Sequence, residues 1–329
     1  MAKLKILTVT KSADMPQMQC RNFFHSVELF NIAEQTPRHS PIMIVAENED
    51  GEVKAHMLAI VRRRGAFFTP HIFSHARVYG EGEYDDDVDR EQVFAEMLLA
   101  LTRKAKRRLC LYVEFSELSS KMFGYKHFRR NKYTAVRWQE VHNSLSDDNG
   151  SKVPGEGISE KMLERIEASK KAGVKTRRAT EDVDINGFYK LLRSHNMMKV
   201  SRFIPQEKLF VNLASSDNVR IFITEYKNKI IGGSACAYSE GNAYMWYLAS
   251  KRKTYLRLHP DIVTVWEAIN YAQENNYAHI YFLDAGLPLK KSSYREFILS
   301  FGGKPVTKYR WFRFFVPWVN RLIGAIYSN

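Results

Sequence analysis

The chain has 329 residues, of which 45% are hydrophobic and 26% are charged, as in a globular protein long enough for two domains. No apolar run has the length of a membrane-spanning helix, and residues 1–10 do not have the apolar core of a secretion signal. The three cysteines, Cys20, Cys110 and Cys236, are far apart, so they predict neither a disulfide framework nor a metal site. They favour a reducing, cytoplasmic location.

The net charge of +14 points to an anionic partner. Nucleic acid, a phosphate-rich cofactor and a membrane with anionic lipid all fit a surplus of this size. A basic surface that serves only solubility is the alternative, and charge alone does not choose among these readings.

A polar segment divides the chain near its middle. Residues 144–157 are rich in Ser, Asp, Asn, Gly and Pro and contain almost nothing to bury. We therefore predict a first domain over residues 1–145, a linker over 146–157 and a second domain over 158–329. The second domain is expected to begin with a helix at 158–171 and a short strand at 174–178.

The two halves repeat one order of elements: strand, hairpin turn, strand, loop, helix, strand. In the first half the apolar pattern predicts a helix at 89–106 and strands at 42–47, 53–62 and 109–115. In the second half it predicts a helix at 260–275 and strands at 219–226, 230–239, 243–249 and 279–283. A repeat of this length indicates a duplicated α/β domain with mixed sheets.

A basic loop precedes the helix of the second half. Four cations lie in it: Lys251, Arg252, Lys253 and Arg257. Pro260 suits the first turn of the helix, and a helix N-terminus behind cations is a natural site for phosphate. The alternative is a solvated basic loop on a structural helix, and the absence of a Gly-rich phosphate cradle favours it.

Polar residues gather where the strands of the second half end. Tyr247 closes one strand, and Asp284 begins a loop where it can act as a base or cap a turn. Tyr294 and Arg295 lie on a short predicted helix, where they can donate a proton and hold an anion, or else belong to a plain surface helix. Arg202 follows another helix as a further anion clamp. The chain has no HExxH, CxxC or GxSxG motif, so metal and serine-hydrolase chemistry are poorly supported.

The C-terminal residues 309–327 mix Trp and Phe with Arg. Residues 308–314 predict a closing strand and 317–327 an amphipathic helix. The segment either packs back onto the body, which we favour, or makes a peripheral contact with the inner face of a membrane.

Three stretches resemble the FemAB family of aminoacyl and acyl transferases. They are a basic helix ending in a Gly-Val turn at 160–179, a hairpin at 230–235 with 244–247, and a helix–strand pair at 258–284 that is followed by a closing segment at 294–303. The first half matches more loosely, through residues 23–26 and 41–46. Phe297 is followed by Ile298, where the family often has lysine, and the helical-hairpin insertion of some tRNA-using members is absent. Both departures argue against a role on a peptidoglycan precursor of the cell wall.

The resemblance implies two tandem GNAT-like acyltransferase domains and transfer of an acyl or aminoacyl group to an amine. It implies no tightly bound cofactor; acyl-CoA or aminoacyl-tRNA would be the co-substrate, and the acceptor an anionic or lipid-linked molecule. Asp284 and Tyr294 are then the predicted catalytic residues, and Arg202, Tyr247 and Arg295 line the acceptor cleft. The two rival readings are a non-catalytic protein that binds an anionic glycan, nucleotide or lipid-linked ligand, and an RNA-binding protein.

Overall fold

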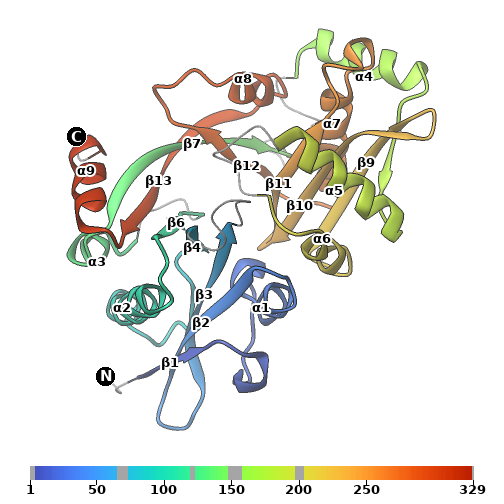
Figure 1. Ribbon diagram of the computed structural model, residues 1–329. Coiled ribbons are helices and arrows are strands. Elements are labelled where there is room, and N and C mark those ends of the chain that lie inside the picture. The colour runs from blue at the N-terminus through green and yellow to red at the C-terminus, as the bar shows by residue number, and fades with distance from the viewer. Residues whose placement is uncertain (1–3, 65–72, 119–122, 147–157, 197–203, 328–329) are drawn as a thin grey trace. The chain divides into compact units, whose positions relative to one another are not determined.

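The computed structural model describes residues 4–64, 73–118, 123–146, 158–196 and 204–327. The chain forms two compact units, whose helices and strands are labelled in Figure 1. Unit 1 consists of Met1–Arg137 together with Lys308–Asn329, and unit 2 consists of Trp138–Thr307.

These units differ from the predicted domains because the end of the chain returns to unit 1. The sequence predicts one domain over 158–329, but residues Arg310–Phe314 pair antiparallel with Tyr112–Ser116 of unit 1. Residues 138–145, expected in the first domain, belong to unit 2. A strand can hydrogen-bond to whichever sheet edge is available, so its place in the chain does not decide its unit. The predicted linker at 146–157 lies outside the described residues except for Ser146.

Unit 1 contains a sheet in the order β1-β2-β3-β4-β6-β13, with β5 paired to β3. The pairs are antiparallel except for β4 and β6, which run parallel. The strands are β1 (Lys5–Val9), β2 (His39–Glu47), β3 (Val53–Arg64), β4 (Phe73–Tyr79), β5 (Glu83–Tyr84), β6 (Tyr112–Ser116) and β13 (Lys304–Phe314).

Helices cover both faces of the unit 1 sheet. Ile42 and Ile44 lie in one core with residues of α2, whereas the alternate residues Met43 and Val45 are equally buried. Successive side chains of a strand point to opposite faces, so β2 is covered on both sides, by α1 and α2 (Figure 1). The helices of this unit are α1 (Val27–Glu34), α2 (Arg90–Arg107), α3 (Tyr125–Arg130) and α9 (Pro317–Tyr327).

Unit 2 repeats this plan with the order β7-β12-β11-β10-β9-β8, in which only β11 and β12 pair in parallel. The strands are β7 (Thr134–Ser144), β8 (Lys175–Arg178), β9 (Val219–Tyr226), β10 (Lys229–Ser239), β11 (Asn242–Ser250) and β12 (His279–Gly286). The helices are α4 (Glu160–Lys171), α5 (Asp182–Asn196), α6 (Glu207–Ala214), α7 (Pro260–Glu274) and α8 (Ser293–Leu299).

Two adjacent glycines let helices approach both faces of β10. A Cβ on Gly232 would collide with Thr264 Oγ1 of α7, and a Cβ on Gly233 would lie 2.6 Å from Phe188 Cδ2 of α5. Since consecutive residues point to opposite faces, α5 and α7 cover opposite sides of this sheet (Figure 1). The Gly-Gly pair is therefore required by packing.

The predicted duplication is confirmed. In each unit a parallel pair of strands is joined by a helix: β4 and β6 by α2, and β11 and β12 by α7. The sequence missed β4, which was expected to be loop, because its mixed polar pattern, Phe-Ser-His-Ala-Arg-Val-Tyr, carries little apolar signal. Within the described part of the chain, no helix is both long and apolar enough to cross a bilayer.

Candidate functional site

The parallel strands of unit 2 diverge near their carboxyl ends. β11 and β12 pair over Asn242–Met245 and His279–Phe282, and both strands continue past this stretch. Tyr247 and Asp284 each lie two residues beyond the last pair, on opposite sides of the divergence. In open α/β sheets, ligands bind beyond the carboxyl ends of such strands.

A β-bulge in β11 accompanies the divergence. Ala235 of β10 faces Tyr247 and Cys236 faces Met245, so Trp246 is an extra residue on β11. A bulge bends its strand and increases the local twist. The bulge therefore turns β11 away from β12 at the level where their pairing stops, and it re-aims Tyr247.

β12 is also irregular at this level. The sequence predicts that the strand ends at Leu283, whereas it extends to Gly286 with a register shift against β7 after Phe282. Asp284 thus lies in the irregular part of a strand and not at the start of a loop.

Arg295 of α8 holds the segment that follows Asp284. Its guanidinium donates to four backbone carbonyls: Ala285 (3.4 Å), Leu287 (2.9 Å), Pro288 (3.4 Å) and Lys290 (2.9 Å). The neighbouring Tyr294 packs partly buried against the apolar core of unit 2. α8 is therefore fixed beside the end of β12. These contacts give Arg295 a positioning role, and its role in binding stays a prediction.

The basic loop connects β11 to α7. Lys251, Arg252 and Lys253 are exposed directly after the strand, and Arg257 is exposed one turn before the helix. The Lys251 N–H donates to the Ile231 carbonyl (2.7 Å), which fixes the start of the loop. Arg252 Nε lies 3.6 Å from Asp261 Oδ2 in the first turn of α7. One cation is thus partly neutralised, and the others face solvent near the positive end of the helix dipole.

A chain of three threonine hydroxyls, two of them fully buried, anchors the start of α7. Thr176 Oγ1 lies 3.2 Å from Thr224 Oγ1, which lies 2.6 Å from Thr264 Oγ1. Thr264 donates to the Pro260 carbonyl (2.6 Å). A hydroxyl has one proton, so Thr224 must donate to Thr264 and Thr176 to Thr224. These hydrogen-bonded hydroxyls join α7 to β8 and β9, and they fix the distance between the helix N-terminus and the sheet.

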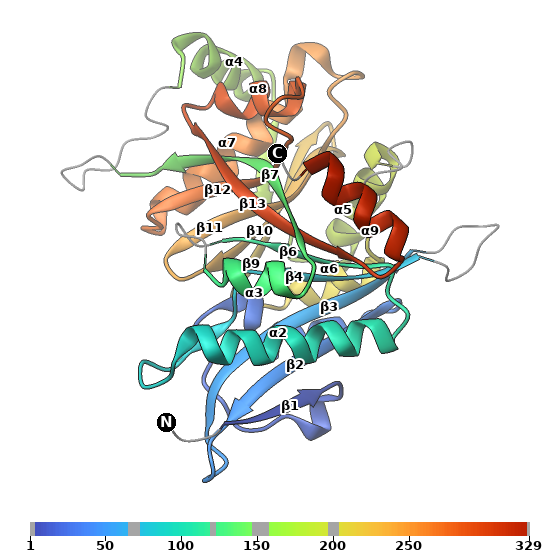
Figure 2. The same ribbon diagram turned by 90° about the vertical axis from the view of Figure 1, so that its left-hand side faces the viewer.

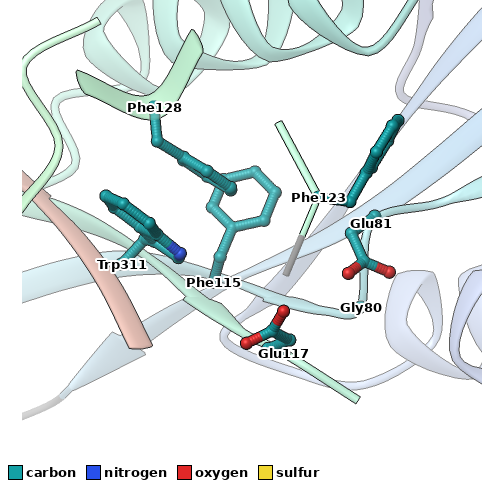
Figure 3. A pocket seen from close by; sticks show the side chains of 7 residues that line it. All are labelled: Gly80, Glu81, Phe115, Glu117, Phe123, Phe128 and Trp311. Carbon is teal, nitrogen blue, oxygen red and sulfur yellow. The ribbon is translucent and has the colours of Figure 1, made fainter. Parts of the chain in front are cut away.

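Unit 1 has a small cavity of its own (Figure 3). It holds about 10 Å³, enough for roughly one water molecule. It is lined by Gly80, Glu81, Phe115, Glu117, Phe123, Phe128 and Trp311. The indole of Trp311 stacks on Phe128 with ring centroids 4.6 Å apart, so that β13 seals this side of unit 1. The cavity is too small for a substrate.

Cys20, His56 and Glu83 form a polar cluster in unit 1 that sequence spacing did not reveal. One ligand atom from each lies within 4.8 Å of the others, the arrangement needed to hold a metal ion. The Glu83 carboxylate, however, already accepts from Arg21 N (2.8 Å) and Asn22 N (3.1 Å), and His56 Nε2 lies 3.2 Å from Oε1. Backbone N–H groups already donate to this carboxylate, and the Arg21 cation lies near it. We therefore interpret the cluster as a structural contact that holds residues 20–22 against β3 and β5.

The structure describes eight of the nine predicted site residues, and these eight form two groups. Tyr247 lies on β11 and Asp284 on β12, and Tyr294 and Arg295 lie on α8, which is held beside the end of β12. The four cations, Lys251, Arg252, Lys253 and Arg257, lie between β11 and the N-terminus of α7. Arg202 lies outside the described residues. The sequence missed the bulge at Trp246 and the hydroxyl chain, because neither leaves a local pattern.

The architecture belongs to the GNAT class of acyltransferase folds. Residues 161–291 match the family model described as an acetyltransferase (GNAT) domain. No curated protein matches the chain by sequence.

Solved structures resemble the chain over nearly its whole length. The structure of FemX matches with a TM-score of 0.62 and 10% identity, over 92% of this chain and 94% of FemX. A tandem GNAT protein from the clavulanic acid biosynthesis pathway has a TM-score of 0.56 and 11% identity, over 95% and 98%. L-PGS from Bacillus licheniformis has a TM-score of 0.54 and 14% identity, over 86% and 88%. The chain therefore has the FemAB-like tandem GNAT fold that its sequence resembles.

Proposed function

We propose that the chain is an acyltransferase that moves an acyl or aminoacyl group from an activated donor to an amine. The observation that carries the proposal is the divergence of β11 and β12 beside the cationic N-terminus of α7. In this proposal the donor phosphates would lie at the cations before α7, and the acceptor would lie beside the polar side chains near the ends of β11 and β12. The GNAT match over 161–291 and the likeness to FemX and L-PGS support the reaction class.

In this proposal the amine attacks the activated carbonyl directly, and no covalent enzyme intermediate forms. The new C–N bond forms, the carbonyl oxygen carries the developing negative charge, and the bond to the leaving thiol or hydroxyl then breaks. Asp284 takes the proton from the amine, and Tyr294 supplies a proton to the leaving group. Tyr247, Arg295 and Arg202 position the acceptor, and most of the rate enhancement comes from orientation.

The donor phosphates would lie near Lys251, Arg252, Lys253 and Arg257. Acyl-CoA and aminoacyl-tRNA both carry phosphates that suit these cations. The tandem GNAT protein is described with reference to AcCoA, which favours acyl-CoA as the first donor to test. An anionic or lipid-linked acceptor remains part of this proposal.

The test is calorimetric titration with acetyl-CoA, with CoA alone for comparison, at low and moderate salt. The charge-reversal variant K251E/R252E/K253E should bind at least about tenfold more weakly, because three phosphate contacts become repulsive. The matched control R103E/K106E/R107E changes the net charge equally on exposed residues of α2 and should stay within about threefold of the parent protein.

Two outcomes would redirect the proposal. Equal weakening by both variants would mean that only the general charge matters, and the donor site would then lie elsewhere. No binding of acetyl-CoA would leave aminoacyl-tRNA as the donor, or a non-catalytic role in binding an anionic ligand. If a donor binds, D284N and Y294F should keep its affinity and slow transfer by about 10²–10⁴-fold.

A further inference from the structure

The C-terminal helix α9 exposes apolar residues where a surface helix normally exposes polar ones. Its exposed residues are Pro317, Trp318, Arg321, Leu322, Ala325 and Ile326, which follow one side of the helix. Trp318, Leu322 and Ile326 recur every four residues and are 67%, 50% and 57% exposed. Side chains four apart lie one above another on a helix, so these three form a continuous apolar stripe.

The orientation of this stripe is set by contacts on the other side of the helix. Asn320 Oδ1 accepts from the Phe314 N–H (2.9 Å), and Asn320 Nδ2 donates to the Lys132 carbonyl (3.2 Å). A Cβ on Gly324 would lie 3.7 Å from Thr134 Oγ1, in ordinary contact. Asn320 of α9 therefore faces the protein, while the apolar stripe faces outward beside the exposed Arg321. Strand β13 completes the core through the buried Trp311, as we favoured from the sequence, whereas α9 has no buried residue.

The surroundings of α9 are positively charged. Residues 308–329 contain no acidic residue; of their four cations Arg321 is exposed, whereas Lys308 and Arg310 are buried and Arg310 lies 3.2 Å from Glu114. α3 is linked to β13 by the stacking of Phe128 on Trp311, and Lys132, which follows α3, is linked to α9 by Asn320. The exposed cations of α3, of the residues after it and of α9 are Lys126, Arg129, Arg130, Lys132 and Arg321, of which Lys126 is paired with Glu91. α9 and α3 lie on the same side of unit 1, which is the left-hand side in Figure 1 and the side that faces the viewer in Figure 2.

We propose that α9 docks on the surface of a bilayer that contains anionic phospholipid. The stripe of Trp318, Leu322 and Ile326 enters the interfacial region while Arg321 and the cations around α3 contact headgroup phosphates. Trp at the headgroup level and basic residues beside it are the features of helices that lie in the plane of a membrane.

The size of α9 argues against two other occupants. The helix has 11 residues and is about 16 Å long, so it can lie on a bilayer but cannot cross it. A stable protein interface buries about 800 Å² on each partner, more than one face of so short a helix supplies. A soluble anion would satisfy the cations but would leave the stripe in water. The proposal concerns a surface outside the site proposed for acyl transfer and does not depend on that activity.

The test uses the full-length protein and two kinds of vesicle, one of pure phosphatidylcholine and one that also contains about 30 mol% phosphatidylglycerol. The protein should co-float with the anionic vesicles only. W318S and L322Q should each weaken this binding by about tenfold, since each removes the insertion of one large apolar side chain. R321E should weaken binding in a salt-dependent way.

The matched control is L109N, which replaces an exposed leucine elsewhere in unit 1. Leu109 is 84% exposed, has a φ of 55° that Asn accepts, and is surrounded by cations such as Arg107 and Arg108. L109N should bind vesicles as the unmodified protein does. Trp fluorescence gives a second readout: a blue shift on addition of anionic vesicles should disappear in W318F.

Three results would overturn the proposal. In the first, the protein floats with neither kind of vesicle; in the second, W318S and L322Q bind the anionic vesicles as tightly as L109N does. In the third, sedimentation of the protein alone would show a dimer that L322Q dissociates, with no change of fluorescence on adding vesicles; the stripe would then be a contact between two copies of this chain.

Discussion

Thr224 Oγ1 donates a hydrogen bond to Thr264 Oγ1 at 2.6 Å, and this bond joins strand β9 to the first turn of helix α7. Both side chains are completely buried. Because the Thr264 hydroxyl donates its own hydrogen bond to the Pro260 carbonyl, the pair holds the N-terminus of α7 at a fixed distance from the sheet. The proposed phosphate site at that N-terminus rests on this contact.

The first prediction concerns this pair. T224V and T264V should each lower the free energy of unfolding by about 1–3 kcal/mol, since each breaks a buried hydrogen bond: T224V removes the donor to Thr264, and T264V removes the acceptor of the Thr224 hydroxyl. The double variant T224V/T264V should cost less than the sum of the two, because it removes both members of the bond. Urea unfolding of the four proteins measures the coupling. Strict additivity would mean that the two hydroxyls do not depend on each other.

The second prediction concerns Gly232 and Gly233. G232A and G233A should each destabilise unit 2 by about 1–3 kcal/mol, because the added methyl meets Thr264 on one face and Phe188 on the other. G324A in α9 is the control of opposite sign: its methyl has room, and alanine should stabilise the helix by about 0.5–1 kcal/mol. Thermal unfolding compares the three variants. Stable G232A and G233A proteins would disprove the close approach of the helices to β10.

The third prediction is a loss of stability at alkaline pH that comes from His56. Burial by itself lowers the pKa of His56, but hydrogen bonds with Cys20 and Glu83 outweigh it and raise the pKa to about 9. A pKa raised by folding stabilises the protein fully below the unfolded value of 6.5, and this stabilisation is lost as pH rises through about 9. Nearby His25 does not titrate in this range, because burial lowers its pKa to about 3.

Urea unfolding at intervals between about pH 6 and pH 10 tests this assignment. H56Q should be less stable than the parent protein at the acid end, and the difference should shrink toward the alkaline end. H279Q is a suitable control, because burial lowers the pKa of the partly buried His279, the opposite direction to His56, so its removal should not reproduce a loss of stability at alkaline pH. A difference that stays constant across the range would remove His56 as the titrating group.

The fourth prediction separates two roles of Arg295. If its donation to four carbonyls positions the segment after Asp284, R295K and R295A should both be destabilised, since an ammonium lacks the planar fork that spans those oxygens. If Arg295 served only as an anion site, R295K would keep both stability and much of the binding. Thermal unfolding, with donor titration on the same variants, distinguishes the two roles.

Hydrophobic periodicity was sufficient to predict most of the elements. The helices at α2 and α7 and the strands from β9 to β12 form within a few residues of their predicted bounds, because periodicity depends on neighbours in the chain. The order of these elements also indicated the duplication. β4 was missed, since Ser74, His75 and Arg77 leave it little apolar signal.

What the sequence determined by itself is thus the local structure, the duplication and the likeness to tandem GNAT folds. Only the tertiary structure decided that β13 pairs in unit 1, that Trp246 bulges as β11 leaves β12, and that Arg295 holds the segment after Asp284. It also decided that the apolar side of α9 faces outward. Each of these depends on contacts between residues far apart in the chain, and an amphipathic pattern predicts an apolar side without saying what will cover it.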